Sequence, residues 1–360
     1  MRGFVEDMRN LFAGGDVLGL DIGTTSIKLV ELARGKGSVN LAGYGLLETR
    51  EYLDRPNAAI QTSALKISER ETVELVKTIV REVNPKTRRV VVSIPAFLAF
   101  FAPLELPELT PAETAKAVAF AARQHIPLSP EAVALDWASI GTGENARGQA
   151  YQRVLLTGIP KTTVLAYQRI VKAAGLRLAA LEVETQAVAR VIRTDVPTLV
   201  VDIGGLAAQA FVVAKGAVHE VGESDYGGFT LSQALGRSLG LSPRRAEDLK
   251  RRRGLSSAPG ERELSTSLYP FVDVILQECR RVRAAYERRG GTPVGSVTVV
   301  GGGGNLQGID GYVSSRLGLP IAPFEIIGTR VSGDAGLTPI ARSLDRTFST
   351  ALGLALRMFP

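Results

Sequence analysis

The chain contains a single cysteine, Cys279, and two histidines among its 360 residues. One cysteine cannot form a disulfide within the chain, and so few cysteine and histidine side chains exclude the usual zinc sites. No apolar run approaches the roughly 18 residues that a membrane-spanning helix needs. Residues 1–15 carry charges throughout and lack the apolar stretch of a secretory signal. We therefore expect a cytoplasmic protein.

Aromatic residues are also scarce, at 6% of the chain. The basic residues gather in three clusters, residues 244–245, 250–253 and 280–289, and the formal net charge is +7. Sites for single-stranded nucleic acid combine such charges with aromatic stacking platforms, and aromatic residues are scarce here, so we expect no nucleic-acid partner. The clusters are either solvated helix faces or contacts with an anionic membrane surface or an acidic partner.

Two short motifs, each an aspartate followed by a glycine turn, close runs of apolar residues. The first is Asp21-Ile22-Gly23-Thr24-Thr25, and the second is Asp202-Ile203-Gly204-Gly205-Leu206. A second apolar run follows each motif, so each pattern predicts a strand, a turn and another strand. Two such hairpins, 181 residues apart (202 − 21), indicate a duplicated fold that can hold a phosphate chain between its halves.

The first hairpin turn offers the groups that bind phosphate. Glycine lets the backbone N–H groups of residues 23–26 approach a ligand closely, and three hydroxyls lie among them. Lys28 adds a positive charge, and Asp21 can hold Mg²⁺ through water because hard oxygen ligands suit that ion. The alternative is an ordinary hairpin without a ligand.

Residues 297–305 form a third element, an apolar strand that ends in four glycines and an asparagine. Four consecutive glycines lose much conformational entropy on folding. A ligand lying against the backbone, such as adenine or ribose, therefore explains them better than a flexible turn does. The chain has no P-loop motif, and these glycines lack the spacing of a dinucleotide-binding fingerprint.

Residues 1–16 are predicted to form an amphipathic segment. Phe4, Met8, Leu11 and Phe12 fall on one face of a helix. This helix either docks on its own domain or tethers the chain to a membrane or a partner.

The order of strands and helices predicts an α/β chain with two lobes. A helix that begins after Thr110, with Pro111 in its first turn and Glu113 three residues after the cap, belongs to a small α+β subdomain inserted in the first lobe. The predicted parts are a first lobe at residues 17–197, the insertion at about 88–177, a second lobe at 198–345, and a C-terminal helix at 346–360 that returns to the first lobe.

These motifs, followed by the segment 351–357, together resemble the actin-like ATPase superfamily. Within it the chain is most similar to the PilM family of type IV pilus assembly proteins, with the FtsA cell-division proteins as relatives. The likeness is carried by residues 18–32, 227–231, 239–242, 246–250 and 278–281. It implies a two-lobed actin-like (ribonuclease H-like) ATPase fold with the inserted α+β subdomain.

The resemblance implies ATP and Mg²⁺ in the cleft between the lobes. It implies that Glu184 orients the attacking water, with Asp202 as a second candidate catalytic residue, although a carboxylate at a helix start is an equal explanation of Glu184. Asp21 and Asp202 would hold Mg²⁺ through water. The implied nucleotide-binding residues are Asp21, Gly23, Thr24, Thr25 and Lys28 in the first loop, Asp202, Gly204 and Gly205 in the second, and Glu278, Arg281, Gly302, Gly303, Gly304 and Asn305 around adenosine.

The second loop departs from the family pattern. Ala207, Ala208 and Gln209 stand where relatives commonly have two threonines and a polar residue. A lost hydroxyl bond to a charged phosphate costs about 1.5–3 kcal/mol, roughly ten- to a hundredfold in affinity or rate. We therefore expect ATP binding with slow or absent hydrolysis, since hydrolysis depends on donors that stabilise the transition state.

The family resemblance also implies a partner, a PilN-like inner-membrane protein. Its short cytoplasmic tail would dock between the inserted subdomain and the core of the first lobe, which would keep the protein peripheral at the inner face of the cytoplasmic membrane. Phe97, Phe100 and Phe101 either contribute to that surface or fill the core of the subdomain. Membrane contact is expected to be indirect or through residues 1–15, and self-association is left open.

Two other functions remain as alternatives. A small-molecule kinase of the same superfamily would need a catalytic aspartate, and the first lobe offers none that convinces besides Asp21. An FtsA-like filament protein would carry an amphipathic membrane helix after its last core helix, whereas this sequence stops at residues 358–360.

Overall fold

The structure is a computed structural model that describes residues 15–48, 69–144, 148–255 and 262–359. The predicted amphipathic helix falls on residues 1–14, outside these ranges, so its role stays a prediction. Among the described helices, none combines the length and the apolar character needed to cross a membrane.

The first lobe is built on a five-stranded sheet in the order β3-β2-β1-β4-β8. The first three strands are antiparallel neighbours, and β4 and β8 continue the sheet parallel to β1. Two helices, α3 and α5, cover one face with apolar side chains. The bounds are β1 Val17–Ile22, β2 Ser26–Arg34, β3 Val39–Glu48, β4 Arg89–Ile94, β8 Arg177–Val183, α3 Glu69–Val83 and α5 Lys161–Ala173.

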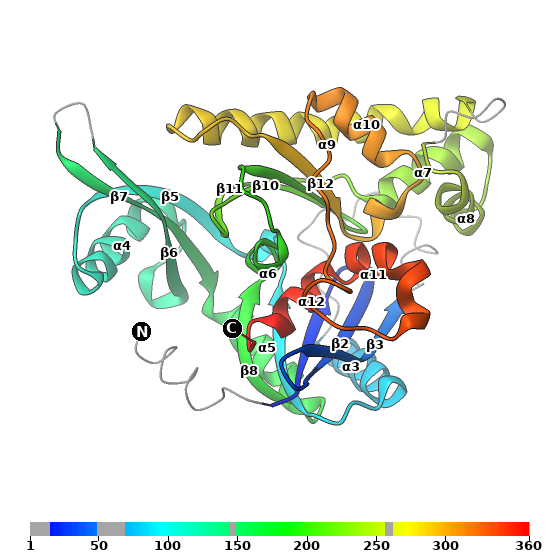
Figure 1. The fold of residues 1–360 in the computed structure, drawn as a ribbon, viewed down its shortest axis with the longest axis horizontal. Helices are drawn as coiled ribbons and strands as arrows, with labels where there is room; N and C mark the ends of the chain where they lie inside the picture. Colours follow the sequence, from blue (N-terminus) through cyan, green and yellow to red (C-terminus); the bar gives the residue numbers. More distant parts are fainter. Residues whose placement is uncertain (1–14, 49–68, 145–147, 256–261, 360) are drawn as a thin grey trace.

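The second lobe repeats this arrangement in a four-stranded sheet of the order β11-β10-β9-β12. β9, β10 and β11 correspond to β1, β2 and β3, and β12 lies parallel to β9 as β4 lies parallel to β1. The outer face is covered by α7, α8, α9 and α10 (Figure 1). The bounds are β9 Thr198–Ile203, β10 Ala208–Ala214, β11 Ala217–Ser224, β12 Ser296–Val300, α7 Gly228–Leu239, α8 Pro243–Arg253, α9 Arg262–Arg288 and α10 Ile309–Leu317.

Two short helices, α6 (Glu184–Val191) and α12 (Ser349–Leu356), lie between the two sheets (Figure 1). Their apolar side chains form one core with strands of both lobes. The two helices approach closely because Gly353 has no side chain, and a Cβ there would lie 2.0 Å from the backbone oxygen of Ala187. The chain end thus returns to the first lobe through α11 (Ala341–Thr347) and α12.

The inserted subdomain is a separate three-stranded antiparallel sheet, β5-β7-β6, with α4 packed on it. The predicted start of α4 is confirmed, since Thr110 and Glu113 form a reciprocal capping box. The predicted limits of 88–177 are wider than this sheet: β4 pairs with β1 and β8 in the first lobe, and α5 packs on that sheet. The bounds are β5 Phe100–Pro107, α4 Pro111–His125, β6 Val133–Glu144 and β7 Ala150–Pro160.

The phenylalanines near the insertion are half-buried. Phe100 packs against the core of the subdomain, and Phe101 packs against the core between the two large sheets. Only Phe100 therefore packs against the subdomain core, and the interpretation that at least two of the three phenylalanines fill that core is not confirmed. Phe97 lies in the short 3₁₀ helix η2 (Ala96–Leu98) that joins β4 to β5.

Candidate functional site

A cavity of about 70 Å³ lies where the two hairpin turns face each other between the lobes. The ends of β1, β4 and β9 and the starts of α6 and α12 enclose it. It brings together residues that are more than 300 positions apart in the sequence. The lining residues are Asp21, Gly23, Thr24, Thr25, Ser26, Lys28, Pro95, Phe97, Glu184, Asp202, Gly204, Gly205, Ala207, Gln209, Gly301, Gly302, Thr347, Ser349 and Thr350.

In the first hairpin, the carboxylate of Asp21 is held by two side chains. Lys28 lies opposite Asp21 in the β1–β2 register, and its Nζ donates to Asp21 Oδ2 at 2.9 Å. Ser93 on β4 donates to Asp21 Oδ1 at 2.9 Å. Burial alone would lower the pKa of Lys28, but Asp21, with Asp202 and Glu184 nearby, raises it above its usual value. Lys28 is therefore a fixed positive charge at the cavity wall.

Among the residues that the structure describes, none forms an ion pair with either of the other two carboxylates of the cavity. Burial, with Asp202 and Asp21 nearby, raises the pKa of Glu184 to about 8. Glu184 begins α6 and its Oε1 accepts from the backbone N–H of Ala96 at 2.8 Å and from Gln209 Nε2. Burial also raises the pKa of Asp202 to about 6, although Lys28 acts in the opposite direction. The cavity thus contains an excess of acidic groups, which a bound cation would relieve.

The two turns touch each other across the cleft. A Cβ on Gly205 would lie 2.1 Å from Thr25 Oγ1, so only glycine allows this approach. The turns have matching backbone bonds, Gly23 N–H to the oxygen of Ser26 and Gly204 N–H to the oxygen of Ala207, both at 3.0 Å. Ligand pockets commonly measure about 300–1,000 Å³. A cavity of about 70 Å³ is smaller than that and suits part of a phosphate chain.

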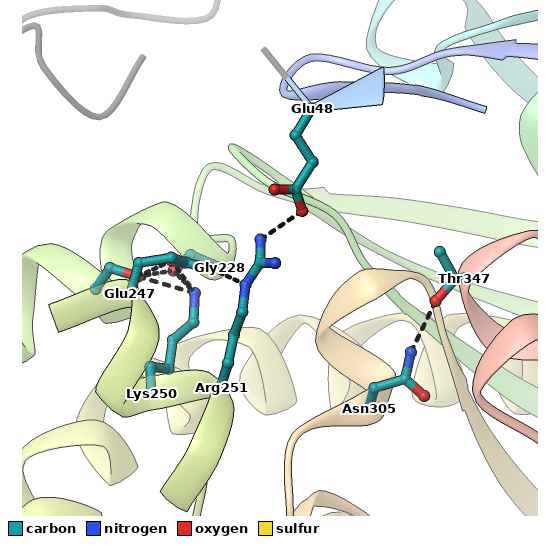
Figure 2. A network of polar contacts seen from close by, with 8 residues as sticks. Glu48, Gly228, Glu247, Lys250, Arg251, Asn305 and Thr347 are labelled. Atoms are coloured by element: carbon teal, nitrogen blue, oxygen red, sulfur yellow. Dashed lines mark hydrogen bonds and ion pairs between the residues drawn. The ribbon is translucent and has the colours of Figure 1, made fainter. Parts of the chain in front are cut away.

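A second contact joins the lobes beside this cavity (Figure 2). Arg251 on α8 forms an ion pair with Glu48, the last residue of β3, at 2.8 Å. Its neighbour Lys250 is buried and donates to the backbone oxygen of Gly228 at 2.6 Å and to Glu247 at 2.7 Å. Because Gly228 N–H donates to the oxygen of Gly204 at 2.9 Å, this network fixes α8 and the start of α7 to the second turn.

The residues expected around adenosine are only partly near the cavity. Gly302 lines it, and Asn305, at the end of the 3₁₀ helix η4 (Gly302–Asn305), donates to Thr347 Oγ1 at 2.8 Å (Figure 2). Gly303 and Gly304 continue the same turn. Glu278 and Arg281 instead pair with each other on α9, beside Gly222 of β11, and do not line the cavity. Their role around adenosine stays a prediction.

Some lining residues were not foreseen from the sequence. Thr347, Ser349 and Thr350 carry a usable signal, since a cluster of hydroxyl residues directly before an apolar run is typical of a helix start. Pro95 and Phe97 carry none, because they reach the cavity through the pairing of β4 beside β1, a contact between distant segments.

The arrangement fits a hydrated Mg²⁺ ion better than a directly held metal. In the part of the chain that the structure describes, no three acidic, histidine or cysteine side chains lie close enough to hold a metal together. Mg²⁺ usually keeps several of its waters. Burial and the neighbouring carboxylates raise the pKa values of Glu184 and Asp202, and a cation nearby would favour their charged forms. The donor set therefore suits a cation held through water.

Comparisons with known proteins agree on family and fold. A family model described as type IV pilus assembly protein PilM matches residues 19–359. The structure resembles that of a PilM–PilN type IV pilus biogenesis complex, with 22% sequence identity over 96% of this chain and 98% of the other and a TM-score of 0.78. It also resembles the ethanolamine utilization protein EutJ of Carboxydothermus hydrogenoformans (19% identity, 98% of both chains, TM-score 0.55). A third similar structure is MreB5 of Spiroplasma citri bound to AMPPNP (14% identity, 94% of both chains, TM-score 0.51).

Proposed function

The chain belongs to the PilM family of type IV pilus assembly proteins, and we propose that in pilus assembly it acts as an ATP-binding scaffold at the inner face of the cytoplasmic membrane. The observation that carries this proposal is the pair of hairpin turns that face one cavity, with Lys28, several hydroxyls and three carboxylates around it. The likeness in fold to an MreB5 that was solved with AMPPNP supports a nucleotide as the ligand.

Each group of the cavity has a place in this proposal. The backbone N–H groups and hydroxyls of residues 23–26, with the ammonium of Lys28, would bind phosphate oxygens. Asp21 and Asp202 would accept hydrogen bonds from the waters of Mg²⁺, and the glycine turn at Gly302 would lie against adenosine. Bound Mg²⁺ would supply the positive charge that neutralises the phosphates and the nearby carboxylates.

Hydrolysis is expected to be slow or absent. Ala207 lines the cavity at the second turn, and neither it nor Ala208 has a hydroxyl to stabilise transition-state charge. Burial raises the pKa of Glu184 to about 8, so in the ligand-free protein at neutral pH only a minor part of this carboxyl is in the charged form that could act as a base. Both features favour stable binding of ATP over its hydrolysis.

Calorimetric titration of the nucleotide-free protein with ATP and Mg²⁺ tests this proposal. We expect micromolar binding, about −8 kcal/mol. Asp202→Asn should keep the fold, because a carboxyl whose pKa is already raised to about 6 loses little when it is neutralised, but should bind ATP with Mg²⁺ at least about tenfold more weakly. The exposed Asp225, changed to asparagine, is the matched control. Absence of binding by the parent protein would refute nucleotide binding and leave a scaffold without a ligand in its cleft.

We further propose that the partner is a PilN-like inner-membrane protein, whose cytoplasmic tail docks between the inserted subdomain and the first lobe. The similar structure of a PilM–PilN complex supports this partner. In this proposal, η2 would provide a route by which a nucleotide influences docking. Ala96 N–H donates to Glu184 and Phe97 lines the cavity, and three residues later Phe100 packs in the core of the subdomain.

This route predicts how a peptide copying the PilN-like tail should behave. In a fluorescence anisotropy titration, we expect the peptide to bind the parent protein with an affinity that changes several-fold when ATP and Mg²⁺ are added. Phe97→Ala should still bind the peptide but lose most of the nucleotide effect, whereas Phe97→Leu, which keeps an apolar side chain, should retain it. Failure of the peptide to bind with or without nucleotide would rule out this partner. An unchanged nucleotide effect in Phe97→Ala would rule out the route through η2.

A further inference from the structure

The two hairpins are structural duplicates, and one of the cavity-lining positions at which they differ lies directly opposite the aspartate. The β1–β2 register places Lys28 opposite Asp21, and the β9–β10 register places Gln209 opposite Asp202. Both pairs are seven residues apart (28 − 21 and 209 − 202). Lys28 neutralises its aspartate through a 2.9 Å ion pair. Gln209 carries no charge, and none of the described residues forms an ion pair with Asp202. The first hairpin therefore supplies its own positive charge beside its aspartate, whereas the second hairpin places a neutral amide there.

Only the nitrogen of the Gln209 amide has a hydrogen-bond partner among the described residues. Its Nε2 donates to Oε1 of Glu184, which also accepts from the backbone N–H of Ala96. Its own Oε1 is buried without a hydrogen-bond partner among the described residues, and the side chain is 7% exposed. An unpaired buried acceptor costs about 1–3 kcal/mol. Because Gln209 lines the cavity, a ligand there can provide the missing donor.

We propose that Gln209 is a positioning residue for the cation that accompanies the nucleotide: its amide N–H holds Glu184, and its Oε1 accepts a hydrogen bond from a cation-bound water beside Asp202. The inference rests on the proposed binding of ATP with Mg²⁺. Water bound to a divalent cation is a strong donor because the ion polarises it, and Mg²⁺ keeps several of its waters in protein sites. A neutral amide can accept this hydrogen bond, whereas a lysine ammonium would compete with the cation for the place beside Asp202.

The test measures ATP affinity with Mg²⁺ and again with EDTA, so that it does not depend on hydrolysis. In the parent protein Mg²⁺ should strengthen binding. Gln209→Met keeps the size of the side chain and removes the amide. It should bind ATP in EDTA as the parent does, but the gain in ATP affinity on adding Mg²⁺ should be about tenfold smaller than in the parent. Gln209→Lys copies the first hairpin and should bind ATP in EDTA at least as tightly as the parent, with little gain from Mg²⁺.

The matched control is Gln186→Met on α6. Gln186 has the same side chain but donates to Thr157 of the inserted subdomain and does not line the cavity. Its Mg²⁺ effect should equal that of the parent, and thermal denaturation should show that all variants fold. An unchanged Mg²⁺ effect in Gln209→Met overturns the inference, as does a parent protein that binds ATP without any effect of Mg²⁺. A parent protein that binds no ATP at all fails the proposed function itself, which is a separate and recognisable result.

Discussion

Replacing Asp21 with alanine is expected to lower the free energy of unfolding by about 3 kcal/mol and to abolish nucleotide binding. Removal of one partner of a buried ion pair leaves the other charge without compensation, which costs about 3–5 kcal/mol. Only 6% of the Asp21 side chain and 15% of the Lys28 side chain are exposed, so the ammonium of Lys28 would be left inside the protein. The hydroxyl of Ser93 would lose its acceptor as well. Urea denaturation measures the change in stability.

The exposed pair of Lys77 and Glu74 on α3 is the control for this prediction. Their side chains are 48% and 66% exposed, and such pairs contribute at most about 1 kcal/mol. Glu74→Ala should therefore leave the urea midpoint almost unchanged. The double variant Asp21→Leu with Lys28→Met removes both charges and should recover much of the lost stability while remaining unable to bind ATP. Equal stability of Asp21→Ala and the parent protein would show that the pair at the cavity is not effectively buried.

Glu184→Gln is expected to stabilise the protein at alkaline pH and to remove any residual hydrolysis. The pKa of Glu184 is raised to about 8 in the folded protein, against an ordinary value of 4.5. Between these values the unfolded chain has lost a proton that the folded protein retains, so the stability from this group falls as the pH rises. From pH 5.5 to its pKa of about 8, the fall is about 3 kcal/mol at about 1.4 kcal/mol per pH unit.

Glutamine at this position cannot ionise, so the variant should escape this part of the pH dependence. Urea denaturation at about pH 5.5 and about pH 8.5 should give similar stabilities for parent and variant at the lower pH and a variant that is more stable by about 3 kcal/mol at the higher pH. Glu74→Gln, at an exposed position, should follow the parent at both pH values. Parallel pH profiles for Glu184→Gln and the parent would contradict a raised pKa. A buried carboxyl that lowers stability but serves the site is an example of the common trade-off between stability and function.

Local features of the sequence predicted much of the fold. The apolar runs before Asp21 and Asp202 indicated β1 and β9, and the structure has both strands with their glycine turns. The capping signals at Thr110 gave the start of α4. These features could be read because each depends on hydrogen bonds and packing within a few residues. The repeated motif also indicated the duplication, and the two sheets have the same strand order.

Contacts between distant segments could not be read in this way. The composition of the strand at residues 89–94 fits the insertion and the first lobe equally well. Its pairing with β1 and β8 places it in the first lobe. The family resemblance implied that Glu278 and Arg281 flank adenosine; in the structure they pair with each other on α9 beside Gly222 of β11, a contact that their positions in the sequence did not indicate.

The sequence by itself determined which residue types lie at the two turns, because an aspartate, a glycine and hydroxyls directly after an apolar strand are placed by the local chain. Only the tertiary structure decided what those residues do to one another. Glu184 meets Gln209 and Ala96 because α6 lies between two sheets. Asp202 faces the neutral amide of Gln209 where the first hairpin has a lysine. Electrostatic energies depend on distance and burial, and both are set by packing between segments that the order of residues does not place.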